Sequence, residues 1–122
     1  METQTGIGEF GPIYEGIKGK YAIDFLLKKK SGEVPGAMKR KELGNIDFIY
    51  GKQGEQGYGL AHIEEYHPDV LPYLVSIIQH GEIFKQAKDR IIIVHKVPLE
   101  KGVAVIRLDW NGIRKQWLVS AF

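Results

Sequence analysis

The sequence contains no cysteine, so the chain has neither a disulfide framework nor a cysteine-ligated zinc site, and no thiol can act as a nucleophile. It also lacks a strong charge of one sign. The formal net charge is only +2 at pH 7, so a nucleic-acid partner has to be inferred from local clusters. No apolar run approaches the roughly 18 residues that span a bilayer, and the first residues lack the pattern of a signal peptide. We therefore expect a cytoplasmic protein without a membrane partner.

The chain has 122 residues, 43% of them hydrophobic, which suffices for one buried core and is too short for two. We predict a single domain over residues 1–122. Residues 1–12 contain three glycines and a proline, which disfavour regular structure, so we expect this segment to be a flexible leader.

Three segments are predicted to be helical. Apolar residues recur at helical spacing over residues 13–30, although the glycines there place the start of the helix as late as Lys20. A short helix over residues 60–66 must end before Pro68. A longer helix is predicted over residues 69–80, with Asp69 as its N-cap.

The remaining pattern predicts strands, and everything after Gly81 is read as sheet. The expected strands cover residues 46–50, 90–97, 103–110 and 116–122. Asn111-Gly112 is a strong signal for a two-residue hairpin turn, which places Asp109 opposite Arg114 and Val103 opposite Ser120. This register predicts a core face made of Ile106, Leu108, Trp110, Ile113, Trp117 and Val119. The expected fold class is α+β, with N-terminal helices packed on a C-terminal antiparallel sheet.

A glycine-rich loop is predicted over residues 51–59, which hold four glycines in nine positions. Such a segment cannot hold a regular element, so we expect a mobile loop between the strand at 46–50 and the helix at 60–66. Loops of this kind often close on ligands.

Three short motifs occur in order: NIDFIYG at residues 45–51, GYGLAHI at 57–63 and WLVSAF at 117–122. Together they resemble the phage-associated nucleases assigned to the barnase, EndoU, colicin and RelE-like (BECR) superfamily, from about the first predicted helix to the last residue. The resemblance implies a BECR-type fold and an endoribonuclease or toxin domain. It also implies RNA as the substrate, with tRNA among the candidates, and an immunity or antitoxin protein as a partner. We expect no cofactor.

Metal-free RNA cleavage needs a base for the ribose 2′-OH, a cation for the phosphorane and an acid for the leaving oxygen. His62 is the best candidate for the base or acid, because imidazole changes protonation near neutral pH. Arg107 and Ser120 share the polar face of the predicted sheet, where they could hold a phosphate. Two further catalytic candidates are Glu65, as a carboxylate base of the barnase type, and His95, as a second member of a pair with His62.

Four other residues are predicted to bind substrate: Lys52, Arg90, Lys96 and Gln116. Arg90 lies near Lys85 and Lys88, and this basic cluster could follow a phosphate backbone. His67 and His80 lie at predicted helix boundaries and are interpreted as capping or solvent-exposed residues. The histidines lack the spacing of a metal site, so we predict none.

The leading interpretation is a metal-independent endoribonuclease of toxin type that cleaves RNA through its 2′-OH. The family frequently has a tyrosine at the final aromatic position, where this chain has Phe122, so that hydroxyl is not available here as a proton donor. The alternative is a non-catalytic RNA- or protein-binding phage accessory domain on the same scaffold. In that case Arg90 and Arg107 bind phosphate, and His62 has no catalytic role.

Overall fold

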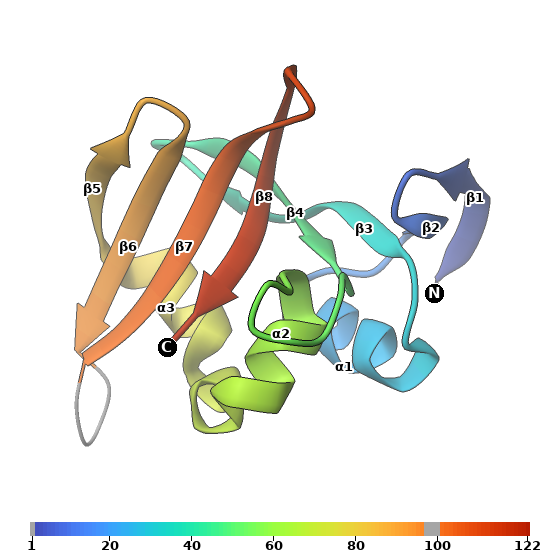
Figure 1. Cartoon of the computed structure of the whole chain (residues 1–122), viewed down its shortest axis with the longest axis horizontal. Helices are drawn as coiled ribbons and strands as arrows, with labels where there is room; N and C mark the ends of the chain where they lie inside the picture. The colour runs from blue at the N-terminus through green and yellow to red at the C-terminus, as the bar shows by residue number, and fades with distance from the viewer. Residues whose placement is uncertain (1, 97–100) are drawn as a thin grey trace.

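The computed structural model describes residues 2–96 and 101–122, and it is an α+β fold built on one sheet (Figure 1). The strands are β1 (Thr3–Gly8), β2 (Gly11–Glu15), β3 (Glu33–Arg40), β4 (Gly44–Ile49), β5 (Glu82–Ala87), β6 (Arg90–Lys96), β7 (Lys101–Trp110) and β8 (Ile113–Ala121). The helices are α1 (Gly19–Lys29), α2 (Gly59–Tyr66), the 3-10 helix η1 (Pro68–Tyr73) and α3 (Leu74–His80). The sheet order is β1-β2-β3-β4-β8-β7-β6-β5, with β2–β3 and β4–β8 parallel and the other pairs antiparallel. The predicted α+β class is therefore confirmed, although the sheet as a whole is mixed.

The amino-terminal segment is a β-hairpin, and the prediction of a flexible leader over residues 1–12 is wrong. β1 and β2 pair with Gly8 opposite Gly11, and Gly11 takes a φ of 103° that side chains rarely adopt. The glycines that looked like breakers thus form the turn. At the tip of the hairpin, the Phe10 ring lies 4.8 Å from Trp110 between centroids. The predicted order of helices first and sheet last is also wrong, because four strands precede α2.

Two predicted helices differ in their boundaries. α1 begins at Gly19, close to the later start at Lys20 that the glycines indicated, whereas Ile13 belongs to β2 and pairs with Gly6. The segment predicted as one helix over residues 69–80 begins with a 3-10 turn that contains Pro72, and only its second half is α-helical. Asp69 lies in the first turn of η1 and is not its N-cap. β3 was not predicted. The elements α2, β4, β6, β7 and β8 lie close to their predicted positions. Residue 97, the predicted end of one strand, lies outside the described residues.

The β7–β8 hairpin follows the predicted register only near its turn. Asp109 lies opposite Arg114 as expected, but two β-bulges then shift the pairing. Each bulge adds one residue on β8, so Ser120 lies opposite Val105 instead of Val103. Of the predicted core face, only Ile106 and Leu108 belong to the core cluster, so the prediction is wrong for Trp110, Ile113, Trp117 and Val119. Trp117 is buried, but on the other face of the sheet from Ile106, and Ile113 is 72% exposed.

One hydrophobic core joins the helices to the sheet. Its members from β7 and β8 are Ala104, Ile106, Leu118 and Ala121. The residues that alternate with them point the opposite way. We call this side of β7 and β8 the outer face; it carries Val103, Val105 and Arg107 on β7, opposite Phe122, Ser120 and Trp117.

The glycine-rich loop is closed by backbone contacts. Lys52 and Tyr58 exchange two backbone hydrogen bonds of 2.9 Å each. Gly51 has a φ of 79°, and a Cβ at this position would collide with the carbonyl of Tyr58. The loop therefore depends on glycine at this position.

We expect Gly51→Ala to lower the free energy of unfolding by about 2 kcal/mol or more, because it adds a clash to a left-handed backbone conformation. Gly6→Ala is the matched control, since a Cβ there would meet no atom within 4 Å. Urea unfolding of both variants measures the effect. Equal stability of the two variants would show that the loop does not hold this conformation.

Candidate functional site

Helix α2 packs against β8, and its Leu60 and Ile63 belong to the same core as Leu118 and Ala121. β4 and β8 are in register at Asp47 and Trp117, and α2 packs against both strands (Figure 1). The Tyr58 ring, at the start of α2, lies 5.7 Å from the Trp117 ring. Beyond the other end of the helix, the His67 ring lies 5.9 Å from the Phe122 ring. These two contacts place the residues that flank α2 beside Trp117 and Phe122, which lie on the outer face of β8 on either side of Ser120.

His62 lies on the polar side of α2 and is half-buried. Its Nδ1 is 2.9 Å from the carbonyl oxygen of Gly54. Because a carbonyl can only accept, Nδ1 must carry the proton, which leaves Nε2 as the nitrogen that can take or give a proton. The ring is 5.0 Å from Tyr66 and 6.1 Å from His67. The imidazole is thus held in one tautomer whenever it is neutral.

Glu65 is exposed and lies on the same helix, and its carboxylate accepts a hydrogen bond of 2.7 Å from the backbone N–H of Gly54. Its neighbour His62 bonds to the carbonyl of that same glycine. The two side chains therefore hold the loop between them. In this structure Glu65 positions the loop beside His62.

Arginines from two neighbouring strands face each other on the outer face. Arg107 lies opposite Arg90, and its Nε donates a hydrogen bond of 3.0 Å to Asp109. The Nε of Arg90 is buried and has no hydrogen-bond partner among the described residues. Like charges directly opposite in a sheet repel each other. Asp109 offsets part of this repulsion, and an anion such as a phosphate would offset the rest.

Two further predicted site residues, His95 and Lys96, lie on β6. His95 follows the same alternation on β6 as the core residues Ile91 and Ile93, and its ring lies 6.3 Å from His80 of α3. The structure therefore does not bring His95 to His62. Lys96 is exposed at the end of β6, opposite Lys101.

The remaining predicted substrate-binding residues are Lys52, in the glycine-rich loop, and Gln116, on β8. Lys52 is exposed in the glycine-rich loop. The side-chain amide of Gln116 donates to the carbonyls of Leu43 and Asn45, at 2.9 and 2.7 Å. That amide group therefore links β8 to the β3–β4 turn, and its donors are not free for a substrate.

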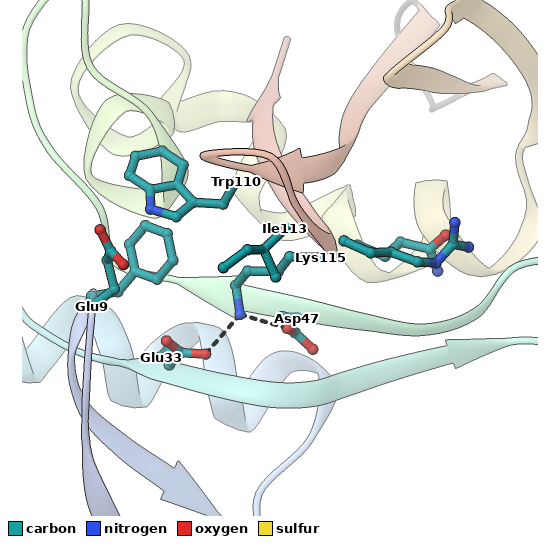
Figure 2. Close-up of a pocket in the computed structure, with 9 residues that line it drawn as sticks. Glu9, Glu33, Asp47, Trp110, Ile113 and Lys115 are labelled. Carbon is teal, nitrogen blue, oxygen red and sulfur yellow. Dashed lines mark hydrogen bonds and ion pairs between the residues drawn. The ribbon is translucent and has the colours of Figure 1, made fainter.

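A buried ion cluster was missed by the sequence analysis. The Lys115 ammonium lies 2.9 Å from Glu33 and 2.8 Å from Asp47 (Figure 2). The other oxygen of Asp47 accepts a hydrogen bond of 2.7 Å from Gly36. Burial alone would lower the pKa of Lys115, but its hydrogen bonds to the two carboxylates and their charges outweigh burial and raise that pKa. The one signal in the sequence was Asp47, an acid inside a hydrophobic strand.

The ion cluster forms the floor of a pocket of about 570 Å³, within the range of roughly 300 to 1,000 Å³ that is usual for ligand sites. Its lining residues are Glu9, Phe10, Glu33, Asp47, Trp110, Ile113, Arg114, Lys115 and Gln116. Phe10 and Trp110 also belong to a cluster of four aromatic rings with Tyr58 and Trp117. Both tryptophans of the chain therefore lie at or beside this pocket.

Neither a metal centre nor a membrane span stands out in the described structure. Over residues 2–96 and 101–122, no group of three or more His, Asp or Glu side chains is placed to hold a metal ion. None of the helices there is long and apolar enough to cross a membrane.

Comparison with known protein families identifies the family of this chain. The model of the family described as phage-Barnase-EndoU-ColicinE5/D-RelE like nuclease1 matches residues 37–122. The chain belongs to this nuclease family. The resemblance seen in the sequence is thereby confirmed, and membership of the PBECR1 family supports a nuclease function. Searches of curated proteins and of solved structures found no significant match.

The PBECR1 family model covers the predicted catalytic residues but only part of the pocket. The matched segment contains His62, Arg90, Arg107 and Ser120, whereas it leaves out the β1–β2 hairpin, α1 and the first residues of β3. Glu9, Phe10 and Glu33, which line the pocket, therefore come from outside the matched segment.

We expect Lys115→Met to lower the free energy of unfolding by about 2 to 3 kcal/mol at pH 7, because it leaves two largely buried carboxylates without their cation. The matched control is Lys20→Met, which breaks an exposed ion pair with Asp24 and should cost less than about 0.5 kcal/mol.

The same pair of variants gives a pH test. The pKa of Lys115 is raised above its usual 10.5, so its contribution is complete below that pH and is lost as the pH rises through the folded-state value. Urea unfolding at pH 9 to 12 should therefore show a steeper loss of stability above pH 10.5 in the wild type than in Lys115→Met. Parallel curves would contradict the ion cluster.

Proposed function

We propose that this chain is a metal-independent endoribonuclease that cleaves RNA by attack of a ribose 2′-OH on the adjacent phosphate. The orientation of His62 is the observation that carries this proposal. Its Nδ1 is tied to Gly54, so Nε2 is left to take the proton from the 2′-OH. The 2′-oxygen then bonds to phosphorus while the bond to the 5′-oxygen breaks, which leaves a 2′,3′-cyclic phosphate.

Arg107 and Arg90 supply the positive charge in this mechanism. Two guanidinium groups on adjacent strands can hold the phosphate oxygens and stabilise the charge that develops in the phosphorane. Ser120 shares the outer face with Arg107 and would add one neutral hydrogen bond.

His67 is the best candidate for the acid that protonates the leaving 5′-oxygen. Its ring lies 6.1 Å from that of His62, a separation that lets two imidazoles flank one phosphate group. His67 also contacts Phe122, which is exposed at the end of the same face and can stack on a neighbouring base. The sequence predicted that His67 is a capping or solvent-exposed residue, and it is the C-cap of α2, with its backbone N–H bonded to the carbonyl of Ile63.

The test is cleavage of end-labelled RNA by the purified chain in the presence of EDTA. The proposal expects fragments that end in a 2′,3′-cyclic phosphate. Binding of the RNA without cleavage would instead support the non-catalytic module that the sequence left open.

We also propose that this activity acts as a toxin on RNA, including tRNA, in the cytoplasm of the producing or target bacterium, with an immunity protein protecting the producer. Induced expression should then arrest bacterial growth, because cleaved RNA stops translation. The His62→Ala form at equal abundance should be tolerated. Equal growth with both forms would remove the toxin role.

A further inference from the structure

We infer that the pocket beneath the β7–β8 hairpin is a nucleobase subsite that selects guanine in the RNA strand. This inference rests on the proposed nuclease function and adds a specificity to it. The pocket lies next to the outer face, at the end near the turn between β7 and β8. The turn between β1 and β2, strands β3 and β4, and the β7–β8 hairpin all contribute to it (Figure 2).

The pocket offers aromatic surface for stacking. The Phe10 and Trp110 rings line it, and their centroids are 4.8 Å apart. Trp117 and Tyr58 pack behind them at 5.5 Å and 5.5 Å from Trp110, so the Trp110 ring is held from several sides. Rings fixed in this way bind a planar base at a low entropic cost.

The charge of the pocket disfavours phosphate. Glu9, Glu33 and Asp47 line it against two cationic side chains, Arg114 and Lys115. Lys115 is already engaged with Glu33 and Asp47. An anion would therefore meet an excess of carboxylate, whereas a neutral ring that carries N–H donors would be attracted.

Glu9 is the carboxylate with free acceptor capacity. It is exposed at the rim, beside Trp110 in Figure 2, and accepts one long bond of 3.4 Å from Asn111. A carboxylate accepts two parallel N–H bonds best. Guanine presents such a pair, N1–H and the amino group, on one edge. Adenine and cytosine each present only an amino group beside an acceptor, and uracil presents one N–H between two acceptors.

The position of the pocket fits a nucleotide bound at the proposed catalytic site. Trp110 directly follows Asp109, which binds Arg107, and Asp109 also accepts a hydrogen bond of 2.9 Å from the Trp117 indole. Arg107 and Trp110 are three residues apart on β7, which corresponds to about 10 Å along a strand. A base on Trp110 would thus leave its phosphate facing Arg107 on the outer face.

The specificity would reside outside the segment matched by the family model. Glu9 and Phe10 lie at the tip of the β1–β2 hairpin, and Glu33 opens β3, all before residue 37. The β1–β2 hairpin would then be the part of the chain that recognises the base.

Titration of intrinsic tryptophan fluorescence tests this without requiring cleavage, because both tryptophans belong to the cluster. The probes are the 3′-monophosphates of guanosine, adenosine, cytidine and uridine. We expect guanosine 3′-monophosphate to bind at least tenfold more tightly than the uridine nucleotide. Glu9→Gln should remove that preference, whereas Glu15→Gln, an exposed acid on the same hairpin, should retain it.

Equal affinity for the four nucleotides, or a guanine preference that survives Glu9→Gln, would overturn the inference. The outcome is separable from the proposed function. RNA cleavage without a guanine preference would leave the nuclease proposal standing and refute the subsite. Selective guanine binding without RNA cleavage would refute the nuclease proposal alone.

Discussion

His62→Ala is expected to lower the rate of RNA cleavage by a factor of about 10² to 10⁴, the range that a positioned general acid or base contributes. The loss follows from removing the imidazole whose Nε2 takes the proton from the 2′-OH. Single-turnover cleavage of labelled RNA in EDTA measures it. His80→Ala is the control, because His80 is exposed on α3 and contacts His95 instead of the outer face.

A second substitution separates chemistry from loop anchoring. His62→Ala also removes the hydrogen bond to Gly54, so part of its effect could come from a displaced loop. His62→Gln retains an N–H donor for Gly54 but has no nitrogen that titrates. It should be about as inactive as His62→Ala. Recovery of most of the activity in His62→Gln would show that the histidine acts only by holding the loop.

Arg107→Ala is expected to lower turnover about a hundredfold or more while weakening RNA binding far less, because the charge that the guanidinium stabilises develops mainly in the transition state. Separate measurement of kcat and of RNA affinity with a non-cleavable analogue distinguishes the two effects. Ser120→Ala provides a graded comparison, since one neutral hydrogen bond is worth roughly 1 kcal/mol, or about a fivefold loss. A larger loss in Ser120→Ala than in Arg107→Ala would contradict the assigned roles.

Local signals in the sequence predicted much of the carboxyl-terminal half of the fold. The Asn111-Gly112 turn placed Asp109 opposite Arg114, because a two-residue turn allows little choice of register near it. Two bulges farther along β8 then moved Ser120 and turned Trp117 away from the core. These bulges depend on packing between strands, and nothing in the spacing of apolar residues along β8 indicates them.

The amino-terminal half was harder to predict, because its structure depends on distant partners. Glycines at 8 and 11 looked like breakers, yet they close a hairpin whose tip is held by Trp110, about a hundred residues away in sequence. Ile13 fitted a helical stripe and instead pairs in β2. In both cases tertiary contacts outweighed local propensity.

In the candidate site too, local sequence signals indicated some residues, whereas others depend on contacts between distant parts of the chain. His62 could be singled out, because it lies in a motif and on the polar side of a short helix. The Lys115 cluster could not, since Glu33 and Asp47 are 82 and 68 residues away from it in the chain. His95 was paired with His62 on chemical type alone, and the alternation of β6 places it on the same face as the core residues Ile91 and Ile93.

The most direct test of the proposed mechanism uses an RNA in which one cleaved bond has been mapped and the single ribose on its 5′ side is replaced by 2′-deoxyribose. In EDTA, the mechanism predicts that cleavage at this bond stops, because the attacking hydroxyl is gone, whereas cleavage at other sites of the same RNA continues. Cleavage of the 2′-deoxy bond at the original rate would contradict attack by the 2′-OH, and with it the role assigned to His62.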